Sequence, residues 1–234
     1  MSSTPLVSFT LDGSTALLQM DDGKANALSP VLVDELLTAL ARAEKEAAAV
    51  VLLGRPERFC AGFDLRVMMS GRDAALALLQ RGMELLLGFY GTPLPVVVAC
   101  TGHALAGGAL LALTGDVRLG VPGPFKIGLN EVTIGLPVPN LAMQFARDRL
   151  SPQALTRATL LGEIYAPDDA VAAGYLDRVV PAAELLAVAK AEAARLGALS
   201  RGAYAATKEL LRRPTIDGIR ANLAVELARL TGAP

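Results

Sequence analysis

The chain has 234 residues, of which 53% are apolar and 19% are charged. A chain of this length and composition can bury a sizeable hydrophobic core, which excludes disorder as its main state. The formal net charge is -1, and the longest run of cations is the pair Arg212 and Arg213. The sequence therefore offers no basic surface for a nucleic-acid backbone, and we expect no nucleic-acid partner.

Two features bear on the cellular setting. The only cysteines are Cys60 and Cys100, and no paired ligand set accompanies them, so we expect neither a disulfide framework nor a structural zinc site. The stretch between Glu84 and Asp116 has no charged side chain, but prolines and glycines divide it into short pieces that fit a core strand and helix better than a membrane span. The N-terminus has no basic start followed by an apolar run, so no signal peptide is expected. A reducing, cytoplasmic location with no membrane contact is the prediction.

The first half of the chain alternates strand and helix patterns. A turn signal at 12–14 separates two β-rich runs and predicts a hairpin, and Ser29-Pro30 is a typical helix start. The expected elements are strands at 6–11 and 15–20, a helix at 30–46, a strand at 49–53, a loop at 55–64, a helix at 74–89, a strand at 96–100, a glycine-rich turn, a helix from about Gly107, and strands at 117–121 and 125–127. This order predicts an α/β core with parallel crossovers.

The last third of the chain is rich in alanine and leucine and is expected to be nearly all helical. The predicted helices cover 141–150, 151–162, 168–173, 183–196, 202–212 and 217–230. In the last of them Ile219, Leu223, Leu227 and Leu230 form one apolar stripe, which packs either on a neighbouring subunit or on this subunit's own core. We divide the chain into an α/β core at 1–175 and a C-terminal helical region at 176–234.

Two glycine-containing segments are candidate ligand loops. The segment 58–65 follows a buried strand, and 102–110 leads from a buried strand into an apolar helix. Small residues let a backbone approach a ligand closely, although a plain turn or close packing has the same composition. One backbone amide from each loop would form an oxyanion hole, which suits a thioester carbonyl that becomes an enolate. The second segment is not a dinucleotide fingerprint, because Ala104 and Leu105 interrupt that pattern.

The acid or base for such chemistry is expected to be Glu131, which lies in an unusually apolar segment. Burial among apolar side chains would raise its pKa toward that of a working base. The alternative is a carboxylate that caps the helix after Pro139. His103 and Cys60 are weaker candidates, because no triad partner is apparent for the histidine and the cysteine loop is nearly neutral, so a packing role is favoured for both.

Four motifs in order carry a family resemblance. They are Asn26-Ala27-Leu28, the stretch from Phe59 to Leu65, the stretch from Gly102 to Gly108, and Gly128-Leu129-Asn130-Glu131. Together they resemble the crotonase superfamily, which contains the enoyl-CoA hydratases and isomerases. The resemblance implies a spiral core of ββα repeats and a helical C-terminal region that builds a homotrimer or a dimer of trimers. It also implies an acyl-CoA thioester substrate, with no cofactor beyond that coenzyme A and no metal.

The resemblance also implies roles for particular residues. The amides of Phe63 and Gly107 would form the oxyanion hole, and Glu131 would be the catalytic carboxylate. The substrate and coenzyme A contacts implied by position are Lys24, Ala25, Ala27, Ala61, Asp64, Leu65, Arg66, Gly108 and Leu110. Lys24 either reaches a phosphate or is a solvated lysine.

One departure from the family pattern bears on the reaction. Hydratases of this superfamily carry a second glutamate three residues after the hole glycine, and this chain has Leu110 there. Hydration is easiest with two carboxylates, whereas the Δ3-Δ2 enoyl-CoA isomerases of fatty acid metabolism, which this pattern resembles, use one. We therefore expect an enoyl-CoA isomerase. The alternatives are an enoyl-CoA hydratase (a lyase) and a non-catalytic acyl-CoA-binding member of the superfamily.

Overall fold

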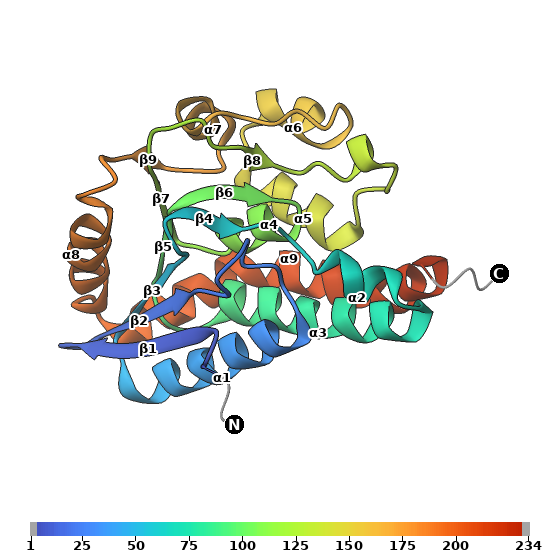
Figure 1. The fold of residues 1–234 in the computed structure, drawn as a ribbon. Coiled ribbons are helices and arrows are strands. Elements are labelled where there is room, and N and C mark those ends of the chain that lie inside the picture. The colour runs from blue at the N-terminus through green and yellow to red at the C-terminus, as the bar shows by residue number, and fades with distance from the viewer. Residues whose placement is uncertain (1–3, 231–234) are drawn as a thin grey trace.

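Two β-sheets organise the chain in the computed structural model, which describes the backbone of residues 4–230 and the side chains of residues 4–222 (Figure 1). The large sheet has six strands in the order β1-β2-β3-β5-β7-β9. The small sheet has three strands in the order β4-β6-β8, all parallel. The large sheet is parallel except for β1, which pairs antiparallel with β2. The strands are β1 (Val7–Asp12), β2 (Thr15–Met20), β3 (Ala49–Leu53), β4 (Glu57–Cys60), β5 (Val96–Cys100), β6 (Gly102–Leu105), β7 (Val117–Gly120), β8 (Ile127–Gly128) and β9 (Arg178–Val179).

The strand order shows the expected spiral of ββα repeats. The strands β3, β5 and β7 are neighbours in the large sheet, and each is followed in the chain by a strand of the small sheet, namely β4, β6 and β8. A helix or helical turn then closes each repeat. The α/β core of ββα repeats predicted from the sequence is therefore present.

Helices cover both faces of the large sheet, because a parallel sheet buries both of its faces. In β3, Val50 and Leu52 belong to the main core, whereas Ala49, Val51 and Leu53 face the smaller core beneath α8 (Leu185–Gly197). Figure 1 shows α8 alone on that side, while α1 (Pro30–Glu46), α3 (Arg72–Gly91) and α9 (Arg201–Leu230) lie together on the other. The remaining helices are α2 (Leu65–Met69), α4 (Gly107–Leu113), α5 (Asn140–Arg149), α6 (Pro152–Thr159) and α7 (Pro167–Ala173), with a 3-10 turn at Val132–Ile134.

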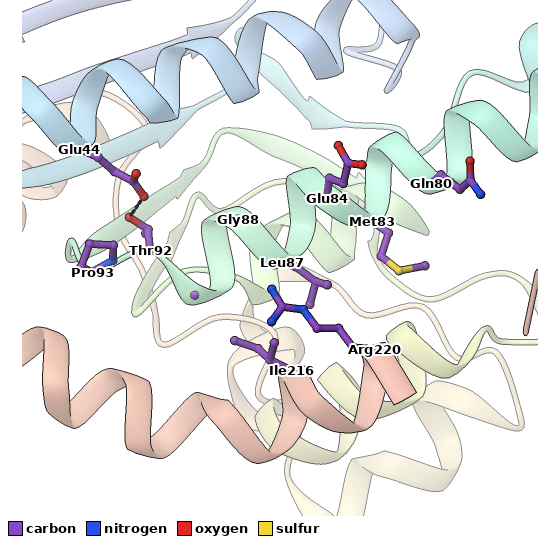
Figure 2. Close-up of a pocket in the computed structure, with 11 residues that line it drawn as sticks. Glu44, Gln80, Met83, Glu84, Leu87, Gly88, Thr92, Pro93, Ile216 and Arg220 are labelled. Atoms are coloured by element: carbon purple, nitrogen blue, oxygen red, sulfur yellow. Dashed lines mark hydrogen bonds between the residues drawn. The ribbon is translucent and has the colours of Figure 1, made fainter. Parts of the chain in front are cut away.

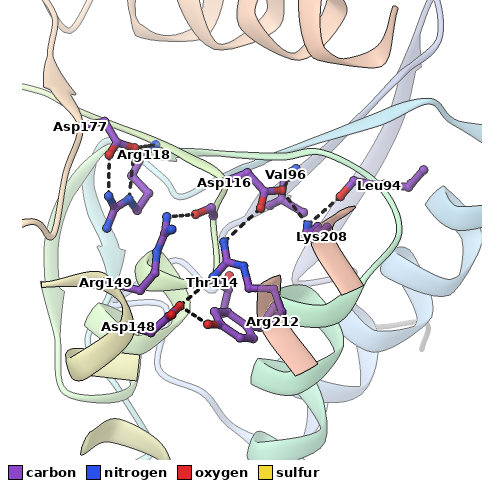
Figure 3. A network of polar contacts seen from close by, with 12 residues as sticks. Leu94, Val96, Thr114, Asp116, Arg118, Asp148, Arg149, Asp177, Lys208 and Arg212 are labelled. Carbon is purple, nitrogen blue, oxygen red and sulfur yellow. Dashed lines mark hydrogen bonds and ion pairs between the residues drawn. The ribbon is translucent and has the colours of Figure 1, made fainter. Parts of the chain in front are cut away.

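A buried polar network fixes α9 against the core (Figure 3). Lys208 donates to the carbonyl oxygen of Leu94 at 2.9 Å and to Asp116 at 2.6 Å, and one turn later Arg212 contacts Asp116 at 3.2 Å. The Arg212 guanidinium also lies 4.0 Å from the centre of the Tyr90 ring. Arg212 is only 2% exposed, so this pairing compensates the cost of burying its charge.

Several expected elements need correction. The predicted loop at 55–64 contains β4, and the predicted glycine-rich turn contains β6. Both strands are short, and the register between them shifts beyond Arg58, so neither gives a clear alternating pattern. Gly102 is required at the start of β6, because a Cβ there would lie 2.1 Å from the backbone of Glu57.

The C-terminal helices predicted at 202–212 and 217–230 are one helix, α9, with Pro214 inside it. A proline normally interrupts a helix because it cannot donate its backbone hydrogen bond. Here Lys208 and Arg212 before the proline and Ile219 after it are all buried, so packing holds the helix across that position. Of the predicted apolar stripe, Ile219 packs in this subunit's own core, and the side chains of Leu223, Leu227 and Leu230 lie outside the described residues. Within residues 4–230, no helix is long and apolar enough to cross a membrane.

Candidate active site

The small sheet brings three segments to one edge. The strands β4, β6 and β8 are parallel, so the residues that follow them emerge at the same end of the sheet. The loop 61–64 follows β4, the start of α4 follows β6, and Glu131 lies just beyond β8. The two glycine loops and the carboxylate that the sequence singled out therefore meet in one place.

The first loop is held in an extended shape by its neighbour in space, the segment 25–28. The Ala61 amide donates to the Ala25 carbonyl at 3.1 Å, and the Leu28 amide donates to the Gly62 carbonyl at 2.8 Å. Asn26 also ties the two segments together, because its side-chain amide donates to the carbonyls of Met20, Arg58 and Phe59, each at 3.1 Å. The loop backbone is thus fixed before any ligand arrives.

The two loops approach each other so closely that glycine is needed. Gly62 has φ +92°, and a Cβ there would lie 3.2 Å from the amide nitrogen of Gly107. Among the described residues, no acceptor is recorded for the backbone amides of Phe63 and Gly107. Gly107 is the first residue of α4, where helix amides lack an intrahelical partner. Two unpaired N–H groups therefore lie on adjoining loops, as an oxyanion hole requires.

The ring of Phe63 is wedged between two glycines from different helices. A Cβ on Gly82 of α3 would lie 2.2 Å from Phe63 Cε1, and a Cβ on Gly107 of α4 would lie 3.1 Å from Cδ2 on the opposite edge of the ring. Glycine in the middle of a helix lowers its stability, so Gly82 is explained by this close approach. The wedge fixes the position of the Phe63 backbone.

The Glu131 carboxyl group is buried, and one of its two oxygen atoms lacks a hydrogen-bond partner among the described residues. The residue is 7% exposed, and among the described residues its Oε2 atom has no hydrogen-bond partner. Burial raises the pKa of Glu131 above its ordinary value, and the residue's own backbone amide opposes the shift only in part. Glu131 does not cap the helix after Pro139, since no side chain caps α5. An unpaired buried carboxylate is costly, and such perturbed groups gather at functional sites.

A cavity of about 700 Å³ joins these groups. Its wall is mostly apolar, and Glu131 is the one carboxylate among the described residues that line it. Ala61, Phe63, Leu65, Gly107, Leu110 and Glu131 are the predicted site residues that line the cavity. Leu110 lies one helical turn after Gly107 on α4 and is 2% exposed, so the position at which the family resemblance expects a second glutamate in hydratases holds a buried apolar side chain.

The other predicted contact residues lie outside the cavity wall. Lys24 and Arg66 are exposed, and the Asp64 side chain caps α2 by accepting from the Arg66 amide at 2.9 Å. Ala25 and Ala27 lie on the segment beside the first loop. Gly108 is a packing residue, because a Cβ there would lie 2.0 Å from the carbonyl oxygen of Cys60.

The histidine and the first cysteine have the packing roles that the sequence favoured. His103 accepts a hydrogen bond from the Lys126 amide at 3.0 Å and stacks edge-on against Phe125. Cys60 is fully buried, and burial raises the pKa of its thiol to about 12, so the thiol stays protonated at neutral pH.

The chain is similar in sequence to proteins of one known family. The family profile described as "Enoyl-CoA hydratase/isomerase" matches residues 10–231. The chain belongs to the enoyl-CoA hydratase/isomerase family. It is 30% identical to human mitochondrial enoyl-CoA delta isomerase 1 over 92% of this chain and 72% of that protein. It is 28% identical to a probable enoyl-CoA hydratase of Bacillus subtilis over 95% of this chain and 88% of that protein.

Solved structures of this family have the same fold as the chain. A family member from Pseudomonas syringae superposes with a TM-score of 0.94 at 40% identity, covering 96% of this chain and 98% of that one. The human mitochondrial delta3-delta2-enoyl-CoA isomerase superposes with a TM-score of 0.93 at 28% identity, covering 97% of this chain and 91% of that one. The superfamily and fold predicted from the sequence are therefore confirmed, and the chain is an enzyme of this family.

The site of this family member also contains residues that the sequence did not indicate. They come from α3, α5, α9 and the loop before α5, and include Leu79, Met83, Leu86, Asn140, Met143, Arg147 and Asn222. Their spacing is that of ordinary helix faces, so nothing in the sequence separates them from core residues. A weak signal was available in the glycines inside the apolar helix α3, Gly82 and Gly88, because such a glycine marks a close approach.

Proposed function

We propose that this enzyme moves the double bond of a 3-enoyl-CoA to the 2-position. The ionised Glu131 takes a proton from C2, and the electrons shift into the thioester carbonyl to give a dienolate. The amides of Phe63 and Gly107 hold the enolate oxygen. The protonated Glu131 then delivers its proton to C4, and the carbonyl reforms with the double bond between C2 and C3.

One observation carries this proposal over hydration. Among the described lining residues the cavity has a single carboxylate, Glu131, and Leu110 stands where a second would be. One carboxyl group is sufficient to move a proton between two carbons of the same substrate, because the acid formed in the first step is the donor in the second. Hydration also needs a group that holds and activates water. The human relative with the isomerase name supports the same choice, although the Bacillus relative bears a hydratase name.

The raised pKa of Glu131 fits the proposed role. A carboxylate that is buried in a largely apolar cavity and has one oxygen atom without a partner is a stronger base than one in water. The enolate oxygen would in turn face two amides on rigid loops, which need no reorganisation during the reaction.

The test is the variant Glu131→Gln, which keeps the shape of the side chain and removes the base. We expect its isomerisation rate to fall by about 10²–10⁴-fold, the usual contribution of a positioned acid or base. Binding of a saturated acyl-CoA, measured by calorimetry, should persist. The matched control is Glu46→Gln at the end of α1, whose carboxylate pairs with Arg42 at the surface. Turnover by Glu131→Gln at the rate of the control would remove Glu131 from the mechanism.

The same assays separate the other candidate functions. Formation of a 3-hydroxyacyl-CoA from a 2-enoyl-CoA would establish a hydratase. Tight acyl-CoA binding with no turnover of either enoyl substrate would establish a non-catalytic binder.

We also propose that coenzyme A is bound between the segment 24–28 and the first loop. The hydrogen bonds between these segments support this, since they place the exposed Lys24 on one and the exposed Arg66 beyond the other. Either cation could pair with a phosphate. Lys24→Ala and Arg66→Ala should raise KM for acyl-CoA and leave KM for acyl-pantetheine unchanged. Equal effects on both substrates would contradict phosphate recognition.

Coenzyme A enters, in this proposal, only as part of the substrate, with no further cofactor or metal ion. Proton transfer by one carboxyl group and an anion held by two amides account for every atom that moves. Dialysis against a chelator should therefore leave kcat unchanged, and activity that is lost on dialysis and restored by a divalent ion would contradict this.

For the assembly we propose a homotrimer or a pair of trimers. The family resemblance supports this, and so does an exposed apolar patch made by Val132 and Ile134 with Leu160 and Leu161. The two parts of the patch adjoin, because a Cβ on Gly162 would lie 2.7 Å from Thr133 Cγ2. Sedimentation equilibrium should give three or six times the chain mass of 24.3 kDa. A monomer would contradict the proposal.

A further inference from the structure

A second cavity of about 770 Å³ lies on the other side of α3, between α1, α3 and α9 (Figure 2). Figure 2 shows Met83 and Leu87 of α3 and Ile216 and Arg220 of α9 pointing into the space between the two helices. We call this space, lined by Met83, Leu87, Gly88, Gly91, Ile216 and Arg220, the α3–α9 groove.

Met83 belongs to both cavities. It lines the candidate active site together with Leu79 and Leu86 of the same helix, and it also lines the α3–α9 groove. It is the one described residue common to the two linings. Methionine is unbranched and has three rotatable bonds, so its side chain can move aside more cheaply than a branched or aromatic one. A flexible side chain therefore forms the partition between the two spaces.

Polar side chains and a close helix contact border the groove at the end away from Met83. There Thr92 donates to Glu44 at 2.7 Å, and a Cβ on Gly91 would lie 3.1 Å from Ile216 Cδ1, so α3 and α9 are in close contact. The groove follows about two turns of α3, from Met83 to Gly91.

We infer that Met83 is a specificity-determining residue, and that the distal methylenes of long acyl chains pass it and lie in the α3–α9 groove. This inference rests on the proposed acyl-CoA function. The floor of the groove presents the side chains of Leu87 and Ile216 and the bare backbone of Gly88 and Gly91, which suit an unbranched hydrocarbon. Short acyl chains end in the active-site cavity and do not reach the partition.

The occupant is expected to be a plain hydrocarbon tail. The wall formed by Leu87, Gly88 and Ile216 is apolar, and the charged side chains at the groove carry both signs, Glu44 and Glu84 against Arg220, so they do not favour a charged chain end. Each methylene that leaves water contributes about fourfold to affinity, so several methylenes in the groove would produce a strong preference for long chains.

The experiment measures binding rather than turnover, so that it does not depend on the isomerase reaction. Dissociation constants for hexanoyl-CoA and tetradecanoyl-CoA are determined by calorimetry for the full chain and for three variants. Leu87→Trp fills the groove without touching the active-site cavity, Met83→Ala widens the partition, and Leu210→Trp is a size-matched control on an exposed face of α9. The quantity compared is the ratio of the two dissociation constants.

The inference predicts that the wild-type chain prefers tetradecanoyl-CoA and that Leu87→Trp reduces this preference by about tenfold or more, the effect of losing a few methylene contacts. Met83→Ala should maintain or increase the preference, and Leu210→Trp should leave it unchanged. A preference that Leu87→Trp leaves at the wild-type value, with both ligands still bound, would overturn the inference and leave the proposed function intact. Failure of the wild-type chain to bind either thioester would instead overturn the proposed function, and the inference with it.

Discussion

Gly82 gives the sharpest test of how the site is positioned. In Gly82→Ala the new Cβ would lie 2.2 Å from Phe63 Cε1 and 2.6 Å from Cζ, so the ring must retreat by about 1.2 Å to reach ordinary contact at 3.4 Å. Gly107 lies close to the opposite edge of the ring, where a Cβ would be 3.1 Å from Cδ2, so little space is left for a retreat and we expect the displacement to reach the Phe63 backbone, whose amide we assign to the oxyanion hole.

We expect Gly82→Ala to lower kcat strongly and the free energy of unfolding only slightly. A misplacement of about 1 Å can cost roughly 10²-fold in rate, and losing one oxyanion donor costs about 10²–10³-fold. We therefore expect kcat for a short 3-enoyl-CoA to fall about 100-fold, or about 2.7 kcal/mol in activation free energy, with little change in KM. Alanine favours the helix by about 0.5–1 kcal/mol, and overpacking costs about 1–3 kcal/mol, so unfolding free energy should fall by only about 1 kcal/mol.

The assay is steady-state isomerisation together with urea unfolding, and the control is Gly218→Ala. Gly218 also lies inside a helix, but its nearest neighbour, Gln144, would be 4.0 Å from the new Cβ. The control should gain about 0.5–1 kcal/mol of stability and keep its kcat. A folded Gly82→Ala protein with kcat within threefold of the control would refute the reasoning.

Four further predictions follow, two for Glu131, one for Leu110 and one for the α9 network. Because burial raises the pKa of Glu131, kcat/KM should fall on the acid side at a pH above the ordinary carboxyl value of 4.5, and an acid limb at or below 4.5 in a pH–rate profile would contradict the assignment. Because the pKa is raised by folding, the folded state binds the Glu131 proton more tightly than the unfolded state, and ionisation of this carboxyl group lowers the folding stability as the pH rises through 4.5 and beyond. Glu131→Gln should therefore raise Tm at neutral pH and lose that advantage below pH 4.5. Leu110→Glu places a second carboxyl group in the cavity and should introduce hydration of 2-enoyl-CoA, measured as 3-hydroxyacyl-CoA; an unchanged product would mean that this position does not set the reaction type. Arg212→Met removes the cation from Asp148, which keeps the hydrogen bond from Tyr90, and leaves Asp116 paired with Lys208, so it should cost about 1–3 kcal/mol in urea unfolding, whereas an unchanged stability would show that Arg212 does not hold α9.

The sequence predicted the parts of the candidate site whose residue types stand out from their neighbours in the chain. A carboxylate among apolar residues identified Glu131, and strand-to-helix transitions with glycine identified the loops of Phe63 and Gly107. Parallel pairing of β4, β6 and β8 then brings the three together, although two of these strands were too short and irregular to be predicted from periodicity.

The rest of the site could not be predicted because it depends on tertiary contacts. Met83 and Asn222 reach the cavity from helices that are far apart in the sequence, and their spacing is that of any amphipathic helix. Pro214 misled the prediction for a related reason. A local rule ends the helix there, but the buried contacts of Lys208, Arg212 and Ile219 keep α9 continuous.

In the proposed mechanism, Glu131 and the amides of Phe63 and Gly107 generate an enolate. Proton NMR of the enzyme in D2O with a saturated acyl-CoA and then with a 3-enoyl-CoA tests it directly, because an enolate exchanges its C2 protons. We expect deuterium at C2 of the saturated ligand and migration of the double bond in the enoyl substrate, and we expect Glu131→Gln to lose both. Bound ligand with no exchange at C2 and no migration would contradict it.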